Sequence, residues 1–161
     1  MTALDRYYVS NPENERLYLA FKISHSQMTQ TYYFVDDSQD LTVTDPSVAG
    51  GVFTAEAIAY TESVQPDSLD KTATLVLNDY GDVIDTELDN IDIDNNEDIL
   101  CTVYKHHSSD LSQSQEQATY AVGDVSQEDG AVTLSLARPQ LNREGAGLAM
   151  TKKAFPMLAG I

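Results

Sequence analysis

The sequence predicts a mainly β fold: an antiparallel β-sandwich or barrel-like domain with one short helix and an extended C-terminal arm. Three observations support this class. Apolar residues alternate with period two in several short runs, turn residues such as Asp-Gly and Gly-Gly separate these runs, and only one stretch has helical spacing. The 161 residues suit a single domain, which we place at residues 1–144, with the arm at residues 145–161.

The first half of the chain contains five predicted strands. Residues 17–23 alternate between apolar and other side chains, as in a half-buried strand. The aromatic and β-branched run at residues 31–35 predicts a second strand, and residues 41–43 a short third one. Residues 52–60 are interpreted as one strand, although their alanines leave a helix open as the alternative. Residues 72–78 are interpreted as the next strand.

The second half adds a strand and a hairpin. Residues 97–104 alternate as a strand, and the Asp129-Gly130 pair between the runs 118–125 and 131–137 predicts a β-hairpin. The total is about six to eight strands, as in a sandwich. We expect the inward faces of these strands to form the core: Leu17, Leu19, Phe21, Leu75, Leu77, Ile99, Cys101, Val103, Val132, Leu134 and Leu136.

One stretch between the strands has helical spacing. Val83, Ile84, Leu88 and Ile91 fall on one face of a short helix, with acidic residues between them. Asp82 is the expected N-cap of this helix. A second stretch, residues 108–117, is polar and is interpreted as a mobile hairpin loop.

The charge is strongly acidic and unevenly distributed. The chain has 26 Asp and Glu against 9 Lys and Arg, a net charge of −17. Residues 23–137 hold 22 acids and only two basic residues, whereas residues 138–161 hold four basic residues and one acid. Such a charge argues against nucleic acid or an anionic membrane as the main partner, and it also favours solubility. It further suggests that the basic tail of one copy meets the acidic body of another.

We expect no membrane span and no secretory signal. No apolar run approaches the length of a transmembrane helix, and residues 1–10 lack a basic stretch followed by an apolar one. With one cysteine the chain has no intrachain disulfide.

Candidate metal ligands and catalytic groups are few. The acidic run at residues 92–98 resembles a calcium loop, but Glu97 and Val103 occupy positions where an EF-hand has Gly and Glu. An irregular calcium site stays as the alternative to a solvated acidic turn. His106 and His107 are adjacent, so on a strand they point to opposite faces and cannot bind one ion together.

The remaining reactive side chains are interpreted as structural. We interpret His25, His106 and His107 as surface histidines and Cys101 as a buried, inert thiol. No nucleophile motif or phosphate-binding glycine loop is present in the sequence. We therefore predict no catalytic, cofactor-binding or metal-binding residues, and no enzyme activity.

The order of elements along nearly the whole chain resembles a family of minor tail proteins of phages with long non-contractile tails. The matching stretches follow the same order as in the family. They are the first strand at residues 17–25, the tyrosine-rich strand at 31–36, a strand with the pattern Phe-x-Ala at 52–58, the strand and helix at 73–91, a hydrophobic strand at 99–104, a late strand pair at 120–136, and the terminal Phe155-Pro156-Met157-Leu158. Members of this family usually carry more arginine in the central strands than this chain does.

The resemblance implies a structural part of the virion, assembled in the host cytoplasm. By this resemblance the protein lies at the tail tip or baseplate, in a three- or six-fold ring of its own copies between the tail tube and the receptor-binding hub. The alternative is a monomeric soluble β-sandwich module that binds a carbohydrate or a protein. In the ring, we expect the arm to dock on a neighbouring subunit through Lys152, Lys153, Phe155, Pro156, Met157 and Leu158. The alternative is that the arm folds back and covers its own domain.

Overall fold

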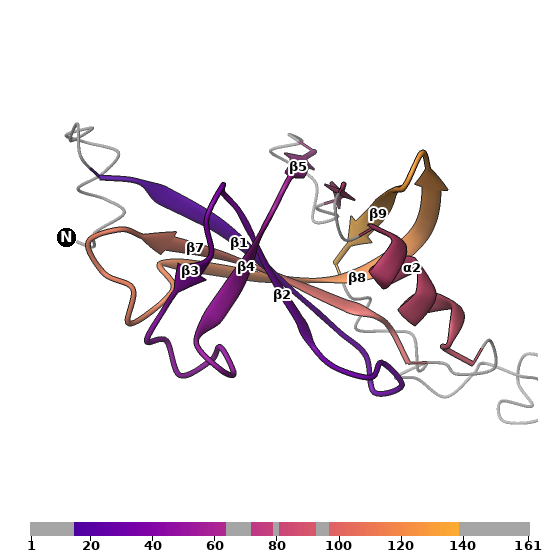
Figure 1. Ribbon diagram of the computed structural model, residues 1–161, viewed down its shortest axis with the longest axis horizontal. Coiled ribbons are helices and arrows are strands. Elements are labelled where there is room, and N and C mark those ends of the chain that lie inside the picture. Colours follow the sequence, from indigo (N-terminus) through magenta and orange to yellow (C-terminus); the bar gives the residue numbers. More distant parts are fainter. Residues whose placement is uncertain (1–14, 64–71, 79–80, 93–96, 139–161) are drawn as a thin grey trace, which may run out of the picture.

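The computed structural model describes residues 15–63, 72–78, 81–92 and 97–138, and within these residues the fold is mainly β, as predicted. Nine strands form a single sheet in the order β3-β4-β2-β1-β7-β8-β9-β6-β5 (Figure 1). The elements are β1 Leu17–Ser24, β2 Tyr32–Asp36, β3 Leu41–Thr42, β4 Val52–Glu56, β5 Ile58–Glu62, β6 Thr72–Leu77, α2 Gly81–Asp89, β7 Leu100–His107, β8 Glu116–Glu128 and β9 Ala131–Ala137.

The sheet is mainly antiparallel, as predicted, and β2 and β4 form its one parallel pair among the described strands. β4 lies beside β2 and runs in the same direction, with Phe34 opposite Thr54 and Val35 opposite Ala55. The parallel pairing arises because the segment after β2 includes the short strand β3, which reverses the chain before β4 begins. The pair is therefore a consequence of this crossover and not of the side-chain pattern of either strand.

The sheet curls so that its two halves face each other. Strand β5, at one end of the sheet, approaches β1, and the ring of Tyr60 lies 5.3 Å from the ring of Phe21. Helix α2 packs against β9 (Figure 1). The first hydrophobic core lies inside this curl and includes Phe21, Ile23, Phe34, Leu75, Leu77, Ile84, Cys101, Val103, Val132, Leu134 and Leu136.

This core agrees with the residues predicted to be buried. Eight of the eleven are buried in it, and Leu19 and Ile99 are half-buried and pack against it. Leu17 is half-buried at the start of β1 and is not part of this core.

A second hydrophobic core lies on the opposite face of the central strands. It is formed by Ala20, Val35, Leu41, Val43, Val48, Phe53 and Tyr104. β7 is consequently buried on both faces, with Cys101 in one core and Tyr104 in the other. Alternation of apolar residues predicts only one buried face, so the second core did not follow from the strand pattern.

The run at residues 52–60 is two strands and not one. Ala57 separates β4, in one half of the sheet, from β5, in the other half. The carbonyl of Ala57 accepts hydrogen bonds from the backbone and side-chain nitrogens of Asn78 at 3.3 and 2.7 Å. The chain thus crosses from one half of the curled sheet to the other without a turn.

Helix α2 occupies the predicted stretch but differs in its first turn. It begins at Gly81, so Asp82 lies inside the first turn and is not the N-cap. Ile84 is fully buried, whereas Val83 is 43% exposed, because the buried face continues through Glu87 instead. None of the helical residues in the described part of the chain forms a span long and apolar enough to cross a bilayer.

The predicted hairpin is present at Asp129-Gly130. Both residues have positive φ, 52° for Asp129 and 83° for Gly130, as a two-residue turn between twisted strands requires. A bulge between Val122 and Val125 shifts the pairing of β8 with β9.

Candidate functional site

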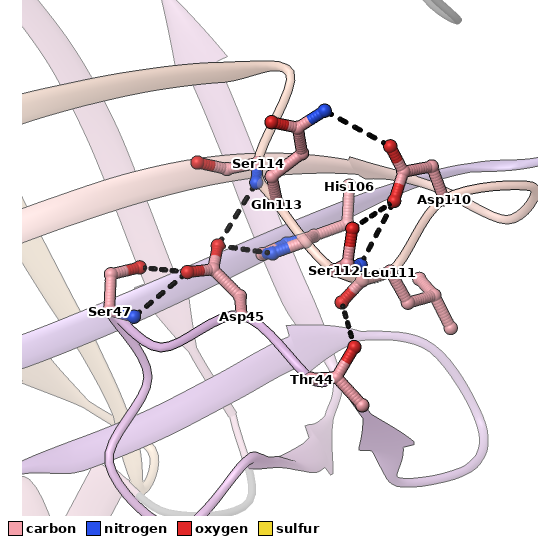
Figure 2. Close-up of polar contacts among 9 residues, drawn as sticks. All are labelled: Thr44, Asp45, Ser47, His106, Asp110, Leu111, Ser112, Gln113 and Ser114. Carbon is pink, nitrogen blue, oxygen red and sulfur yellow. Dashed lines mark hydrogen bonds and ion pairs between the residues drawn. The ribbon is translucent and has the colours of Figure 1, made fainter.

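Two loops meet at one end of the sheet and form the most extensive polar network in the described residues. The loop between β3 and β4 lies against the loop between β7 and β8, and the backbone N–H of Thr44 donates to the carbonyl of Leu111 at 2.9 Å. Figure 2 shows the two loops and the side chains that join them.

Asp45 lies at the centre of this network. Its carboxylate accepts hydrogen bonds from the backbone N–H and hydroxyl of Ser47 at 2.8 and 2.6 Å, and from the backbone N–H of Ser114 at 3.0 Å. The side chain of His106 lies 3.2 Å away through its Nε2 (Figure 2). Asp45 is only 6% exposed, so these four contacts replace nearly all of its hydration.

His106 is fully buried on the β7 face that carries the second core. Its ring stacks on the ring of Tyr104, with 5.9 Å between the ring centroids, and packs against the ring of Phe53, with 5.7 Å between the centroids. Among the described residues its Nδ1 has no hydrogen-bond partner. The arrangement therefore favours the neutral tautomer in which Nε2–H donates to Asp45.

The two groups have shifted pKa values. Burial lowers the pKa of His106, because it disfavours the charged imidazolium more than the Asp45 and Asp110 carboxylates favour it. Burial opposes ionisation of Asp45, but hydrogen bonds from Ser47, His106 and Ser114 outweigh it and lower the pKa of this carboxyl group. At neutral pH the pair is a carboxylate and a neutral imidazole.

The loop between β7 and β8, interpreted from the sequence as a mobile hairpin loop, forms hydrogen bonds of its own. Oδ1 of Asp110 accepts from the backbone N–H and hydroxyl of Ser112, and its Oδ2 accepts from the amide of Gln113 at 3.1 Å. These bonds lower the pKa of Asp110, and the bond from the Ser112 hydroxyl contributes most to this shift. The loop backbone is further tied to β7 by Gln115 N–H, which donates to the carbonyl of Lys105 at 2.8 Å.

The three histidines were predicted to be surface residues, and this prediction is wrong. The side chains of His25, His106 and His107 are all buried. As predicted, neighbours on β7 point to opposite faces, so His106 meets Asp45 and His107 meets Glu15. Burial of β7 on both faces is the reason for the error at His106 and His107. His25 lies in the loop after β1, where its Nε2 is 3.9 Å from Oε2 of Glu97.

His107 links an acid to a hydroxyl. Its Nε2 lies 3.3 Å from Oε2 of Glu15, and its Nδ1 lies 2.7 Å from the hydroxyl of Ser109. The same order of groups activates serine nucleophiles in hydrolases. Here, however, the backbone N–H groups of Ser108, Ser109 and Asp110 all donate within or beside the turn, so none is free to stabilise an oxyanion. This geometry supports a structural turn.

A third polar anchor fixes helix α2 to the loop after β1. Glu87 accepts a bond from the Thr29 backbone N–H at 2.8 Å, a short bond from the Thr29 hydroxyl, and one from the Tyr32 hydroxyl at 3.0 Å. The bonds from Thr29, more than the one from Tyr32, lower the pKa of Glu87. Glu87 follows Ile84 by three residues, which places an acid on the buried face of the helix. This spacing is the signal in the sequence that could have revealed the contact.

The remaining predictions concern Cys101 and metal ions. Cys101 is buried as predicted, and burial raises its pKa to about 12. Within the described residues no group of three His, Cys, Asp or Glu side chains could hold a metal ion; residues 93–96 of the acidic run lie outside that part. The predicted interface residues at positions 152–158 also lie outside the described residues.

An open cleft of about 420 Å³ lies over β5, β6, β9 and β8. The bulge in β8 at Gly123 and Asp124 forms one side, and Thr61 and Glu62 of β5 form the other. Most side chains between them are small or carry hydroxyl groups; the lining residues are Thr61, Glu62, Ser63, Thr72, Ala73, Thr74, Gly123, Asp124, Ser135, Leu136 and Ala137.

A comparison with protein families identifies the family of this chain. No curated protein matches the chain. A family described as Domain of unknown function (DUF1833) matches residues 3–141, a span that contains every strand and the helix described above. Because this match covers most of the sequence, the chain belongs to the DUF1833 family.

Proposed function

We propose that the protein is a structural component of a phage tail tip or baseplate. In this role, copies of the chain form a three- or six-fold ring that joins the tail tube to the receptor-binding hub. The observation that carries the proposal is the division of charge along the chain, between an acidic β domain and a basic terminal segment that also holds an apolar cluster. The order of elements, which resembles minor tail proteins of long-tailed phages, supports the same role.

A ring subunit needs two different surfaces that fit each other. In a closed ring each copy uses one surface to contact the copy on one side and the other surface for the copy on the other side. An acidic body and a basic tail provide such a pair, and their attraction also guides the correct encounter. The same division of charge would reduce contacts between two bodies, because both are strongly acidic.

A subunit of this kind also benefits from a stiff body. The Asp45 network joins the loops at one end of the sheet, and Glu87 joins helix α2 to the loop after β1. Both anchors connect segments that are distant in the sequence and restrict the loops through charged hydrogen bonds. A rigid body can present its surfaces in fixed positions to neighbouring subunits.

The test combines assembly with location. The full chain should form a cyclic oligomer in light scattering and negative-stain images, and its mass should fall as salt is raised because charge pairs are screened. Antibodies against the chain should label the tail tip of particles of the phage that encodes it. A monomer at every concentration, together with particles that contain none of the protein, would contradict the proposal.

The cleft over β5, β6, β9 and β8 favours a second candidate, a monomeric binding module. Its hydroxyl groups and two acids, Glu62 and Asp124, suit a polar ligand such as a carbohydrate. In that case the protein stays monomeric and retains a particular sugar in a glycan screen. Substitution of Ser135 by a bulky residue would then abolish retention without changing the oligomeric state.

A further inference from the structure

Strand β5 is an exposed edge of the sheet. Among the described residues it pairs with β6 alone, and its residues are exposed or half-buried. Hydrogen bonds at both ends of the pair show which residues of β5 are bonded to β6. Ser63 N–H donates to the Thr72 carbonyl, and Asn78 N–H donates to the Ala57 carbonyl. In an antiparallel pair, bonded residues alternate with unbonded ones, so the backbone groups of Ile58, Tyr60 and Glu62 point away from β6.

The side chains of these same three residues lie on the inner face of the curled sheet. Tyr60 packs against Phe21, and Ile58 packs against the first core. Glu62 is exposed, and its carboxylate accepts a hydrogen bond of 2.7 Å from the Tyr60 hydroxyl. The edge thus presents an acid, an aromatic ring and an aliphatic side chain in alternate positions, together with backbone groups that have no partner in the described part of the chain.

The terminal segment of the chain carries side chains that match those of β5, with a base, an aromatic ring and an aliphatic side chain in alternate positions. Lys153, Phe155 and Met157 are separated by one residue each, so in an extended segment all three lie on one face. Set antiparallel to β5, this face brings Lys153 opposite Glu62. Phe155 then lies opposite Tyr60, and Met157 opposite Ile58.

We infer that residues 152–158 of a second copy add to the edge of β5 as an antiparallel strand in this alignment. Opposite charges, paired aromatic rings and paired aliphatic side chains directly across two strands each stabilise the pairing. The backbone groups of Ile58, Tyr60 and Glu62 gain partners at the same time, as in other cases of strand addition.

The position of Pro156 is compatible with this alignment but not with an alignment shifted by one residue. Opposite Ala59, it lies at a position where the added strand directs its backbone groups away from β5, so its missing N–H is not needed there. A shift of one residue would place Pro156 at a bonding position and would turn Lys153 and Phe155 to the other face. Proline on the outer side also prevents a further strand from adding.

This inference rests on the proposed function, since it describes the contact between neighbouring copies of a ring. It commits to a strand from the neighbour, because a head-to-tail ring requires one surface of each copy to be filled by the next. Docking of the segment on its own β5 is the competing arrangement. Two tagged versions of the chain distinguish these arrangements.

The first experiment uses mixed disulfides. One full-length chain carries Glu62→Cys and a second, with a different tag, carries Lys153→Cys; the native Cys101 is buried and present in both. We expect a disulfide-linked pair containing both tags. The matched control, Thr61→Cys with Lys153→Cys, should yield about tenfold less, because Thr61 directs its side chain to the other face.

The second experiment exchanges the charges. Glu62→Lys and Lys153→Glu should each weaken association by about fivefold, and the double variant should restore it, as expected for a direct cross-strand pair. Asp124→Lys, in the cleft but away from the edge, is the matched control and should leave association nearly unchanged.

The outcomes separate this inference from the proposed function. If rings form but no mixed disulfide appears and the charge exchange does not restore association, the strand addition is wrong and the ring proposal stands. If Glu62→Cys and Lys153→Cys close only when both are on the same chain, the segment docks on its own body, and the inference is again wrong. If the chain never associates and labels no particle, both proposals fail.

Discussion

The imidazole of His106 and the carboxylate of Asp45 lie 3.2 Å apart, although the residues are 61 positions apart in the sequence. This contact holds the loop after β3 against the end of β7, and Ser114 adds a bond from the following loop. Both partners are buried, so each satisfies a polar group that water cannot reach. The pair therefore fixes the shape of this end of the sheet.

Asp45→Ala should lower the free energy of unfolding by about 2–4 kcal/mol. The change leaves the Ser114 N–H and the His106 ring without their acceptor in a buried setting, and such unpaired groups are costly. Chemical denaturation of both proteins measures the difference. Ser112→Ala, which removes one bond inside an exposed turn, is the control and should have a much smaller effect. If Asp45→Ala lowered the free energy of unfolding as little as Ser112→Ala does, the Asp45 network would contribute little to stability.

Stability should fall on acidification below about pH 6.5, and His106 should account for part of the loss. The pKa of this imidazole is lowered in the folded protein, so below its ordinary pKa of about 6.5 the unfolded chain takes up a proton that the folded chain refuses. Protonation then favours unfolding until the pH reaches the lowered pKa. The lowered pKa of Asp45 adds a second loss at lower pH, beginning near the ordinary pKa of an aspartate.

Melting temperatures measured from pH 8 to pH 5 test this prediction. His106→Gln keeps a donor for Asp45 and removes the titration, so its melting temperature should vary less over this range than that of the unchanged protein. Asp110, the other acid facing this histidine, is ionised throughout this pH range and does not contribute to the difference between the two proteins. An identical slope in both proteins would assign the effect to other groups.

The sequence predicted which segments are strands better than it predicted what the strands bury. Period-two alternation located β1, β6 and β9, and Asp129-Gly130 located the hairpin, because these are local properties of the backbone and its side chains. The burial of His106 was missed, since a second core on the other face of β7 depends on segments distant in the sequence. The same limit applies to Asp45 and Glu87, whose partners come from other parts of the chain.

Leu75→Ala should lower the free energy of unfolding by about 2–5 kcal/mol, as removal of a large core side chain usually does. Leu75 is fully buried in the middle of β6 and packs in the first core. The control is Leu100→Ala at the start of β7, where the side chain is 37% exposed and less contact is lost. Denaturant melts of the two variants should therefore differ clearly. A loss below about half a kcal/mol for Leu75→Ala would contradict the assigned core.

Cys101 should not react with thiol reagents in the folded protein. Its side chain is buried, and burial raises its pKa to about 12, so the reactive thiolate is scarce at neutral pH. Labelling followed by mass spectrometry should show modification only when denaturant is added. Thr61→Cys, on the exposed edge strand, provides a rapidly labelled control in the same protein. Fast labelling of Cys101 without denaturant would show that this core opens readily.

Deletion of residues 150–161 should abolish assembly and leave the folded body intact. The deleted segment holds Lys152, Lys153 and Phe155, the residues proposed to contact a neighbouring copy, whereas both described cores lie within residues 15–138. We therefore expect an unchanged melting temperature at low protein concentration, together with a monomeric mass in light scattering. Lys153→Ala should retain the apolar contacts and shift assembly to lower salt, because it removes one charge pair. A truncated chain that still assembles but melts earlier would show that the segment covers its own body.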